Sequence, residues 1–279
     1  MAKKIDKIRM IVSDIDGTMS DTNMLSDYTK EVLNKVHEKG ILFGIASGRP
    51  YYAIRRSIGL WELKYQPDII IGMNGAQLYD TKTNELTEQN VLSVEAMKEI
   101  YDFMEPYRDK TNLFIYGDNC TIFEKNDEIF IQGFIKYKEV EKCYVAEELK
   151  DMFKESTPKM LFRLYDENDM PGLEKYIAEH PNPHFTGFKT QTNLMEFVDP
   201  RVNKYVAVHQ YALKHDISEE AIAGFGDMSN DYELIRDSGI GVCLLNGSDD
   251  CKSVADYVTE KDCSHDGFAD FIDRYILSE

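Results

Sequence analysis

Apolar segments of strand length alternate with helical segments over the first third of this chain, and this alternation limits the folds that it can adopt. The apolar segments cover residues 8–12, 41–46 and 68–73. Ser26 is a good helix cap and Gly40 a good helix end between the first two segments, and residues 51–58 form a second helical segment. Strands separated by helices imply right-handed crossovers and a parallel sheet.

The pattern changes near residue 83 and returns after residue 198. The intervening stretch contains a predicted hairpin at residues 113–123 and further strands at residues 159–165 and 194–198. Two helices are predicted in it, at residues 145–153 and 173–179. The earlier alternation of helices and strands then resumes. It gives a helix at residues 204–214, a strand at residues 221–226, a helix after Ser229 and a strand at residues 239–245. We therefore predict an α/β fold, a Rossmann-like doubly wound parallel sheet core. The core would comprise residues 1–82 and 199–279, with an inserted α+β cap at 83–198.

The composition excludes several classes of partner. A formal net charge of −18 disfavours binding to nucleic acid or to anionic membranes, because both are polyanions. The five cysteines form no CxxC pair and do not suggest a disulfide framework, so we expect reduced thiols. No apolar run is long enough for a signal peptide or a membrane span. We predict a cytoplasmic protein whose oligomeric state the sequence leaves open.

Polar motifs follow four of the predicted strands or open the helices after them. They are Asp14-Ile15-Asp16-Gly17-Thr18, Ser47-Gly48-Arg49, Lys204 and Gly226-Asp227-Met228-Ser229-Asn230-Asp231. Each has an ordinary structural interpretation: a turn with local hydrogen bonds, a helix cap, a solvated helix charge and an acidic turn. Ligands of doubly wound sheets bind beyond the carboxyl ends of the strands. Four polar motifs at such junctions therefore favour one shared site.

In this order and at these separations, the four motifs resemble those of the haloacid dehalogenase superfamily, and within it of the Cof-type phosphatases with a large α/β cap. The resemblance covers nearly the whole chain, including the loop at residues 73–76 and the tail at residues 239–267. Two positions depart from the family pattern. Tyr205 stands where the family usually has glycine, and Met19 replaces a common leucine. Tyr205 could narrow the entrance beside Lys204. This departure puts in doubt the identity of the substrate and not the type of reaction.

The resemblance implies a catalytic role for each aspartate of the first motif. Asp14 would be the nucleophile that forms an aspartyl-phosphate, and Asp16 would be the general acid and base. Mg²⁺ would be bound by Asp14, by the backbone carbonyl of Asp16 and by Asp227, because Mg²⁺ prefers oxygen ligands. Asp231 would support this site from behind.

The resemblance also implies which groups bind the phosphate. Ser47 would donate a hydrogen bond to the phosphoryl group, and Lys204 would offset negative charge on the nucleophile and the phosphate. Asn230 would contact the phosphate or a metal-bound water. Arg49 would flank the site, and direct contact between Arg49 and the substrate is left open.

These expectations describe a magnesium-dependent phosphatase that hydrolyses a small phosphorylated metabolite, such as a sugar phosphate. Two alternatives remain at this point. One is a phosphotransferase or sugar phosphomutase that uses the same aspartate, and the other is a non-catalytic sensor of a phosphorylated ligand. The sequence does not name the substrate or the cap residues that select it.

Overall fold

The chain forms two compact units in the computed structural model, which describes residues 5, 7–22, 24–136 and 141–278. A core unit comprises residues 1–87 and 203–279, and an inserted unit comprises residues 88–202. The predicted boundaries after residues 82 and 198 lie a few residues before these divisions and stay a prediction. No helix in the described part of the chain combines the length and the apolar character that crossing a membrane requires.

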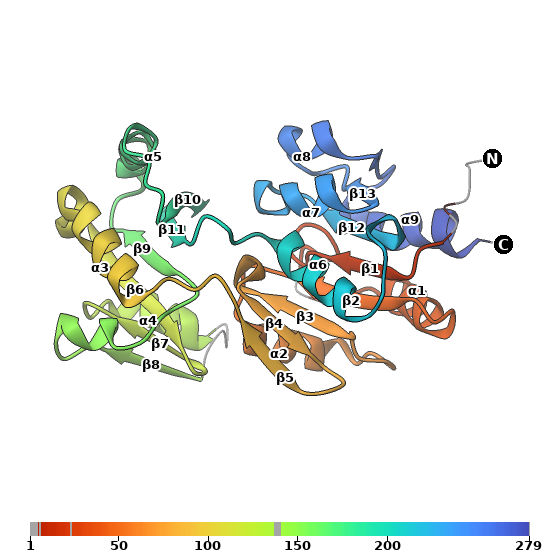
Figure 1. The fold of residues 1–279 in the computed structure, drawn as a ribbon, viewed down its shortest axis with the longest axis horizontal. Coiled ribbons are helices and arrows are strands. Elements are labelled where there is room, and N and C mark those ends of the chain that lie inside the picture. The colour runs from red at the N-terminus through yellow and green to blue at the C-terminus, as the bar shows by residue number, and fades with distance from the viewer. Residues whose placement is uncertain (1–4, 6, 23, 137–140, 279) are drawn as a thin grey trace. The chain divides into compact units, whose positions relative to one another are not determined.

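The core unit is built on one eight-stranded sheet with the order β14-β13-β12-β1-β2-β3-β4-β5 (Figure 1). Its strands are β1 (Met10–Ser13), β2 (Leu42–Ala46), β3 (Ile69–Gly72), β4 (Gln77–Asp80), β5 (Glu85–Glu88), β12 (Ile222–Gly226), β13 (Ile240–Cys243) and β14 (Tyr257–Val258). The strands from β14 to β3 pair in parallel, whereas β4 runs antiparallel to β3. Strand β1 lies between β12 and β2, so residues that follow these three strands meet at one edge of the sheet.

Helices cover both faces of the core sheet, as the predicted doubly wound fold requires. They are α1 (Asp27–Glu38), α2 (Tyr51–Trp61), α6 (Lys204–Lys214), α7 (Tyr232–Asp237), α8 (Asp249–Val254) and α9 (Gly267–Phe271). Side chains of α1, α2 and α9 pack in one apolar cluster with Ile11, Phe43 and Ile45 of the sheet. Side chains of α6 and α7 pack in another with Met10 and Val12. Because neighbouring residues of a buried strand point to opposite faces and both faces of the sheet are covered, all four residues of β1 are buried.

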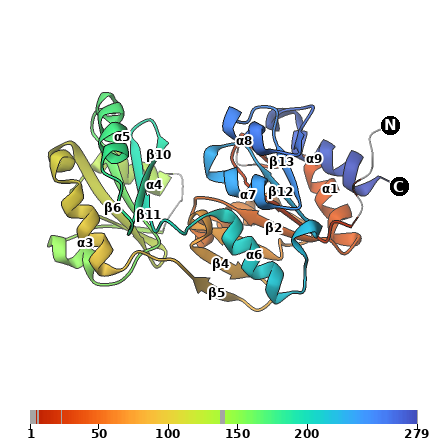
Figure 2. The same ribbon diagram turned by 45° about the horizontal axis from the view of Figure 1, so that its top comes forward.

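The inserted unit contains a six-stranded sheet in the order β10-β11-β9-β6-β7-β8, together with the helices that Figure 2 shows. Its elements are α3 (Val94–Phe103), β6 (Thr111–Gly117), β7 (Cys120–Phe123), α4 (Glu128–Lys136), β8 (Lys142–Val145), β9 (Met160–Leu164), α5 (Met170–Glu179), β10 (Thr186–Gln191) and β11 (Leu194–Val198). All neighbouring strands are antiparallel except β7 and β8. Residues of α3 and α5 form one apolar core with the sheet, and Phe130 and Phe134 of α4 pack on Phe114 and Phe123.

Most of the elements predicted from the sequence are present, with one error. The Ser26 side chain caps α1 by accepting a hydrogen bond from the Thr29 backbone, and α6 begins at Lys204 as expected. The predicted helix at residues 145–153 is wrong. Val145 ends β8, which pairs with β7, and only the short 3-10 helix Leu149–Phe153 follows. Pairing with β7 makes Val145, the first residue of the predicted helix, part of a strand.

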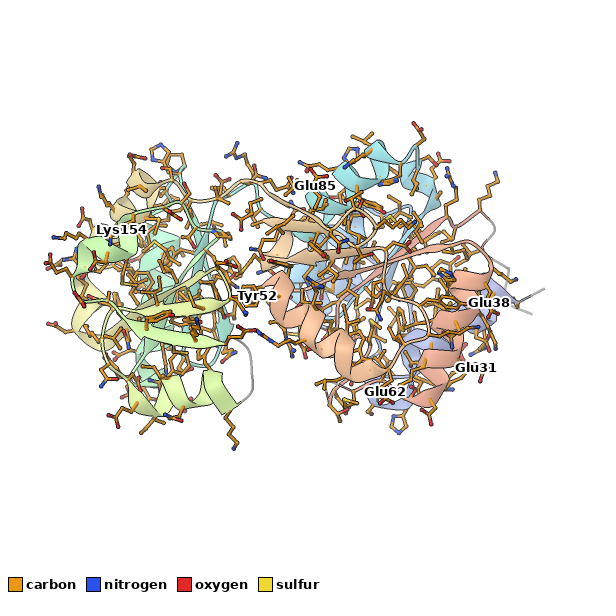
Figure 3. The ribbon with its side chains drawn as sticks, turned by 90° about the horizontal axis from the view of Figure 1, so that it is seen from below. Glu31, Glu38, Tyr52, Glu62, Glu85 and Lys154 are labelled. Carbon is orange, nitrogen blue, oxygen red and sulfur yellow. The ribbon has the colours of Figure 1, made fainter. Side chains whose placement is uncertain are left out.

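Acidic side chains on the helices of the core unit contribute to the negative surface that the composition predicts. Figure 3 shows Glu31 and Glu38 on α1 and Glu62 just past the end of α2. All three residues are exposed. Glu31 forms an ion pair with Lys35, and Glu38 forms one with Lys64, both with partly exposed partners. Exposed pairs of this kind add little stability, about 0–1 kcal/mol each.

Candidate active site

The end of β1 brings Asp14 to the centre of the carboxyl edge of the core sheet. Its backbone N–H donates a hydrogen bond to the Phe225 carbonyl of β12 at 3.0 Å, which continues the sheet pairing past the last strand residue. The Asp14 side chain is buried, with a residue exposure of 6%. A buried carboxylate requires partners, and the chain supplies them from the segment that follows the inserted unit.

Lys204 lies directly beside Asp14. Its Nζ donates hydrogen bonds to Asp14 Oδ1 at 2.7 Å and to Asp231 Oδ1 at 2.5 Å. The Lys204 side chain is completely buried, so the interpretation of this residue as a solvated helix charge is wrong. Lys204 is the first residue of α6, and the Asn203 side chain caps this helix by accepting a hydrogen bond from Val206 N at 2.9 Å. The cap therefore fixes the start of α6 and with it the position of Lys204 beside the edge of the sheet.

The turn after β12 brings Asp227 and Asp231 to the same place. Asp231 Oδ2 accepts hydrogen bonds from the backbone N–H groups of Asp227 at 3.0 Å and Met228 at 3.2 Å. Thr18 Oγ1 donates a hydrogen bond to Asp227 Oδ1 at 2.8 Å. Gly17 makes this approach possible, because it has a φ of +85° and a Cβ there would lie 2.3 Å from Asp227 Oδ2. The glycine of the first motif is thus required both for its backbone conformation and for space.

The described site contains more carboxyl groups than cationic side chains. One carboxylate oxygen from each of Asp14, Asp227 and Asp231 lies within 4.8 Å of the other two. Burial raises the pKa of Asp14 to about 8, against the opposing effect of Lys204. Burial also raises the pKa of Asp227 to about 6. Burial opposes the charge of Lys204, but Asp14 and Asp231 outweigh it and raise the lysine pKa, so we expect Lys204 to be protonated.

These carboxylates fit a hard divalent cation. They provide only oxygen donors, which Mg²⁺ prefers, and a bound cation would favour the ionised forms that burial disfavours. Asp231 differs from the other two, because both of its oxygens already accept hydrogen bonds from Lys204 and from the backbone. This arrangement favours Asp14 and Asp227 as ligands and a supporting position for Asp231.

The Asp16 side chain points to a different neighbour. Asp16 Oδ1 accepts a hydrogen bond from Arg49 Nη2 at 2.7 Å. The exposed fractions of the two side chains are 52% for Asp16 and 30% for Arg49, in contrast to the buried Asp14. Arg49 Nη1 also donates to Ser57 Oγ on α2 at 3.4 Å. The two aspartates of the first motif therefore have different environments although a single residue separates them.

The loops after β2, β3 and β12 bring Ser47, Asn74 and Asn230 together. Ser47 is buried, and its Oγ accepts a hydrogen bond from Arg49 N at 3.3 Å. Asn74 N donates to the Ser47 carbonyl at 3.0 Å, and Asn230 Nδ2 donates to Asn74 Oδ1 at 3.3 Å. These contacts connect the three loops, so the predicted Ser47 and Asn230 lie in one hydrogen-bonded group.

Tyr205 packs into an apolar layer. It is 8% exposed and belongs to the cluster between α6 and the sheet, where its ring stacks on His209 with centroids 5.9 Å apart. This packing supports the first turn of α6, which carries Lys204. The expectation that Tyr205 narrows an entrance stays a prediction.

Thr18 and Asn246 both contact the site loops, although no role is expected for either residue from the sequence. Thr18 binds Asp227, and Asn246 Nδ2 donates a hydrogen bond to the Gly17 carbonyl at 2.8 Å. Thr18 belongs to the first motif, and Asn246 directly follows the strand predicted at residues 239–245. Its position after a parallel strand was the signal that could have identified Asn246.

The predicted site residues are absent from the pocket of the inserted unit. That pocket is about 560 Å³ and is lined by residues of α3 and the segment just before it, of the loop before β10 and of the segment directly after β11, among them Glu99, His184 and Arg201. The cluster of buried carboxylates, with its shifted pKa values, is instead the candidate for chemistry.

Comparison with known proteins identifies the family. The sequence pattern of the haloacid dehalogenase-like hydrolases matches residues 11–272, which is most of the chain. The chain belongs to this family.

Two curated relatives and one solved structure illustrate how far the similarity extends. The chain is 25% identical to the 5-amino-6-(5-phospho-D-ribitylamino)uracil phosphatase YitU of Bacillus subtilis, over 95% of this chain and 97% of the relative. It is 24% identical to YcsE, a phosphatase of the same name from the same organism, over 97% and 96%. A haloacid dehalogenase-like hydrolase of Bacteroides thetaiotaomicron superposes with a TM-score of 0.81 at 23% identity, over 96% of this chain and 99% of that one.

These findings confirm several predictions made from the sequence. The resemblance to Cof-type members of the superfamily is confirmed, as is the α/β fold with a parallel core sheet and a second, mixed sheet. The predicted enzyme class, a phosphatase of the haloacid dehalogenase-like family, is confirmed as well. The roles of the individual site residues stay predictions.

Proposed function

We propose that this enzyme is a magnesium-dependent phosphatase that hydrolyses small phosphorylated metabolites, sugar phosphates or similar compounds, through an aspartyl-phosphate on Asp14. The observation that supports this most directly is the contact between Asp14 and the buried Lys204, beside Asp227 and Asp231. A phosphate monoester is anionic and repels a carboxylate nucleophile. A site that gathers a nucleophile, an ammonium group and oxygen ligands for a cation reduces this repulsion.

In the first step, an Asp14 carboxylate oxygen attacks the phosphorus atom. A bond forms between this oxygen and phosphorus, and the ester bond to the leaving group breaks. Lys204 holds Asp14 Oδ1 at 2.7 Å and thereby orients the carboxylate and offsets its charge. The Ser47 hydroxyl would donate a hydrogen bond to a phosphoryl oxygen, and Asn230 would contact the phosphoryl group or a metal-bound water.

Asp16 would move the protons. As the acid, it gives a proton to the leaving oxygen, so that a neutral alcohol departs. As the base, it then takes a proton from water, whose oxygen attacks the phosphorus of the aspartyl-phosphate. Inorganic phosphate leaves, and the Asp14 carboxylate is restored. The larger exposure of Asp16, 52% against 9% for the Asp14 side chain, suits a group that must reach both the substrate and water.

Asp14, Asp227 and the backbone carbonyl of Asp16 would hold Mg²⁺. When it is bound, the ion would neutralise negative charge on the phosphoryl group and on the nucleophile. Thr18 and Gly17 contribute by placing Asp227, and Asp231 contributes by fixing Lys204 and the turn after β12.

The substrate class rests on the relatives and on the inserted unit. YitU and YcsE are named as phosphatases of a phosphorylated ribityl compound, which is a small phosphorylated metabolite. We propose that residues 83–198 act as a movable cap, which excludes water and selects the part of the substrate beyond the phosphate. Substitutions in this segment should then change the preference among substrates more than the rate with a small generic ester.

A phosphate-release screen tests the proposal. Purified enzyme with Mg²⁺ is incubated with a panel of sugar phosphates, nucleotides and cofactor phosphates, and inorganic phosphate is measured without an acceptor sugar. Turnover of at least one ester, lost in excess chelator and restored by Mg²⁺, supports the proposal. Full activity in excess chelator would exclude the metal assignment. Formation of a new sugar phosphate from an added acceptor sugar, without release of inorganic phosphate, would instead indicate a phosphotransferase.

A further inference from the structure

Arg49 lies at the candidate site and has no part in the mechanism above. The motif that contains Arg49 follows β2, and both the N–H and the carbonyl of Arg49 form hydrogen bonds. Arg49 N donates to Ser47 Oγ at 3.3 Å, and the Arg49 carbonyl accepts a hydrogen bond from Met73 N at 2.9 Å. The guanidinium therefore extends from a backbone that is anchored to the ends of two neighbouring core strands.

Arg49 differs from Lys204 in its access to solvent. Among the residues that the structure describes, these two provide the cations in contact with the aspartates of the site. Lys204 is completely buried and bound by two carboxylates, whereas the Arg49 side chain is 30% exposed and bound to the exposed Asp16. An anion that arrives from solvent can therefore reach Arg49 more readily than Lys204.

The ion pair between Arg49 and Asp16 is of a kind that exchanges easily. Partly exposed pairs contribute about 0–1 kcal/mol, because water and salt compete with each partner. A phosphoryl group is a stronger competitor than water. It carries up to two charges and presents oxygens that match the planar fork of a guanidinium. The contact that Asp16 makes with Arg49 also keeps its Oδ1 away from any proton transfer to a substrate.

We propose that Arg49 binds a phosphoryl oxygen of the substrate by exchanging Asp16 for it, and that this exchange releases the Asp16 side chain for catalysis. Arg49 would then be a substrate-binding residue that also positions Asp16. This inference rests on the proposed function, because it assumes that the bound anion is a phosphoryl group. No bond forms or breaks in the exchange, which replaces one hydrogen-bonded ion pair by another.

The experiment measures binding of inorganic phosphate, so that its outcome does not depend on turnover. Isothermal titration calorimetry in excess Mg²⁺ compares the wild type with Arg49→Gln and Arg49→Lys. Loss of a charged hydrogen bond should weaken phosphate binding roughly 10- to 100-fold in Arg49→Gln. Arg49→Lys keeps the positive charge but lacks the planar guanidinium, so its phosphate affinity should fall less than that of Arg49→Gln. Arg55→Gln is the matched control, because Arg55 is exposed on the following helix α2 and should bind phosphate like the wild type.

A double-mutant cycle separates exchange from general charge effects. Asp16→Asn removes the competitor and should tighten phosphate binding, but only while Arg49 is present. In the Arg49→Gln background the same change should give little further gain. An equal gain in both backgrounds would show that Asp16 acts by simple repulsion, and the exchange would be excluded.

Hydrolysis of an ester distinguishes failure of this inference from failure of the proposed function. In Arg49→Gln, the KM for an ester that the enzyme hydrolyses should rise by about the same factor as the dissociation constant of phosphate. A variant with reduced kcat but unchanged KM and unchanged phosphate affinity would overturn the inference and leave the phosphatase assignment intact. A wild type that does not bind phosphate in the presence of Mg²⁺ would overturn the inference as well.

Discussion

Thr18 Oγ1 donates a hydrogen bond to Asp227 Oδ1 at 2.8 Å, although 209 positions separate the two residues in the sequence. The contact between Lys204 Nζ and Asp14 Oδ1 spans 190 positions. Both contacts join the loop after β1 to segments that follow the inserted unit. The candidate site therefore depends on the two separate parts of the core unit folding as one sheet, and its residues can be tested individually.

Replacement of Lys204 should affect stability and turnover together. Lys204→Met leaves Asp14 and Asp231 buried without their shared cation, and breaking a buried pair in this way costs about 3–5 kcal/mol. We expect a lower free energy of unfolding in urea and no measurable phosphate release. Lys214→Met is the matched control at the exposed end of the same helix, and it should change the unfolding free energy by less than about 0.5 kcal/mol. Equal effects of the two substitutions would contradict the structural assignment of Lys204.

The stability of the metal-free enzyme should fall as the pH rises through the range set by its buried carboxyl groups. Asp14 and Asp227 have folded-state pKa values of about 8 and about 6, above the ordinary value of 3.8. Between the unfolded and folded pKa values, the native state binds more protons than the unfolded state. The contribution of these two groups to stability is therefore fully present below about pH 4 and falls progressively as the pH rises to about 8.

Urea unfolding in excess chelator at several pH values between 4 and 8 measures this trend. Asp227→Asn should remove its share of the loss in unfolding free energy between about pH 4 and 6, a share on the order of 2 kcal/mol. Mg²⁺ should restore stability at pH 8, because a ligand that binds only the native state stabilises it. A metal-free stability that rises steadily over this range would contradict the raised pKa values.

The two aspartates of the first motif should give different phenotypes. Asp14→Asn should abolish both phosphoenzyme formation and turnover, because a neutral amide does not attack phosphorus effectively. Asp16→Asn should still be phosphorylated by an ester with a good leaving group, which needs little protonation, and should then fail to hydrolyse the phosphoenzyme. General acid–base assistance is worth roughly 10²- to 10⁴-fold. Rapid-quench measurement of phosphoprotein tests this, and equal phosphoenzyme levels in the two variants would show that the roles are wrong.

Gly17→Ala should displace Asp227. The alanine would adopt an unfavourable φ of +85°, and its Cβ would lie 2.3 Å from Asp227 Oδ2 unless the carboxylate moved. We expect a loss of about 1–3 kcal/mol in unfolding free energy and weaker Mg²⁺ binding in calorimetry. Gly59→Ala is the control, because Gly59 lies on α2 with open space around its Cβ position and no positive φ. That substitution should be neutral or stabilise the protein by up to about 1 kcal/mol.

The strand and helix pattern of the core unit could be predicted from local sequence because each element has a strong local signal. Ser26 and Gly40 mark the ends of α1, and β1 is apolar on both faces. The inserted unit was less predictable. Its segment at residues 145–153 contains a helical pattern, but pairing with β7 makes Val145 part of a strand. The β4–β5 extension of the core sheet was also not predicted, because β5 is exposed and has no apolar alternation.

The sequence by itself determined the chemical groups of the site and the strand ends that carry them. It placed Asp14, Ser47 and Asp227 after parallel strands and Lys204 at a helix start, since these follow from patterns within a few residues. The tertiary structure alone decided the partners of these groups. The sequence left open whether Lys204 is a solvated charge, and it placed Arg49 only beside the site without naming its partner. Such pairings depend on which strands are neighbours, and the order β12-β1-β2 is determined by long-range packing that no local segment encodes.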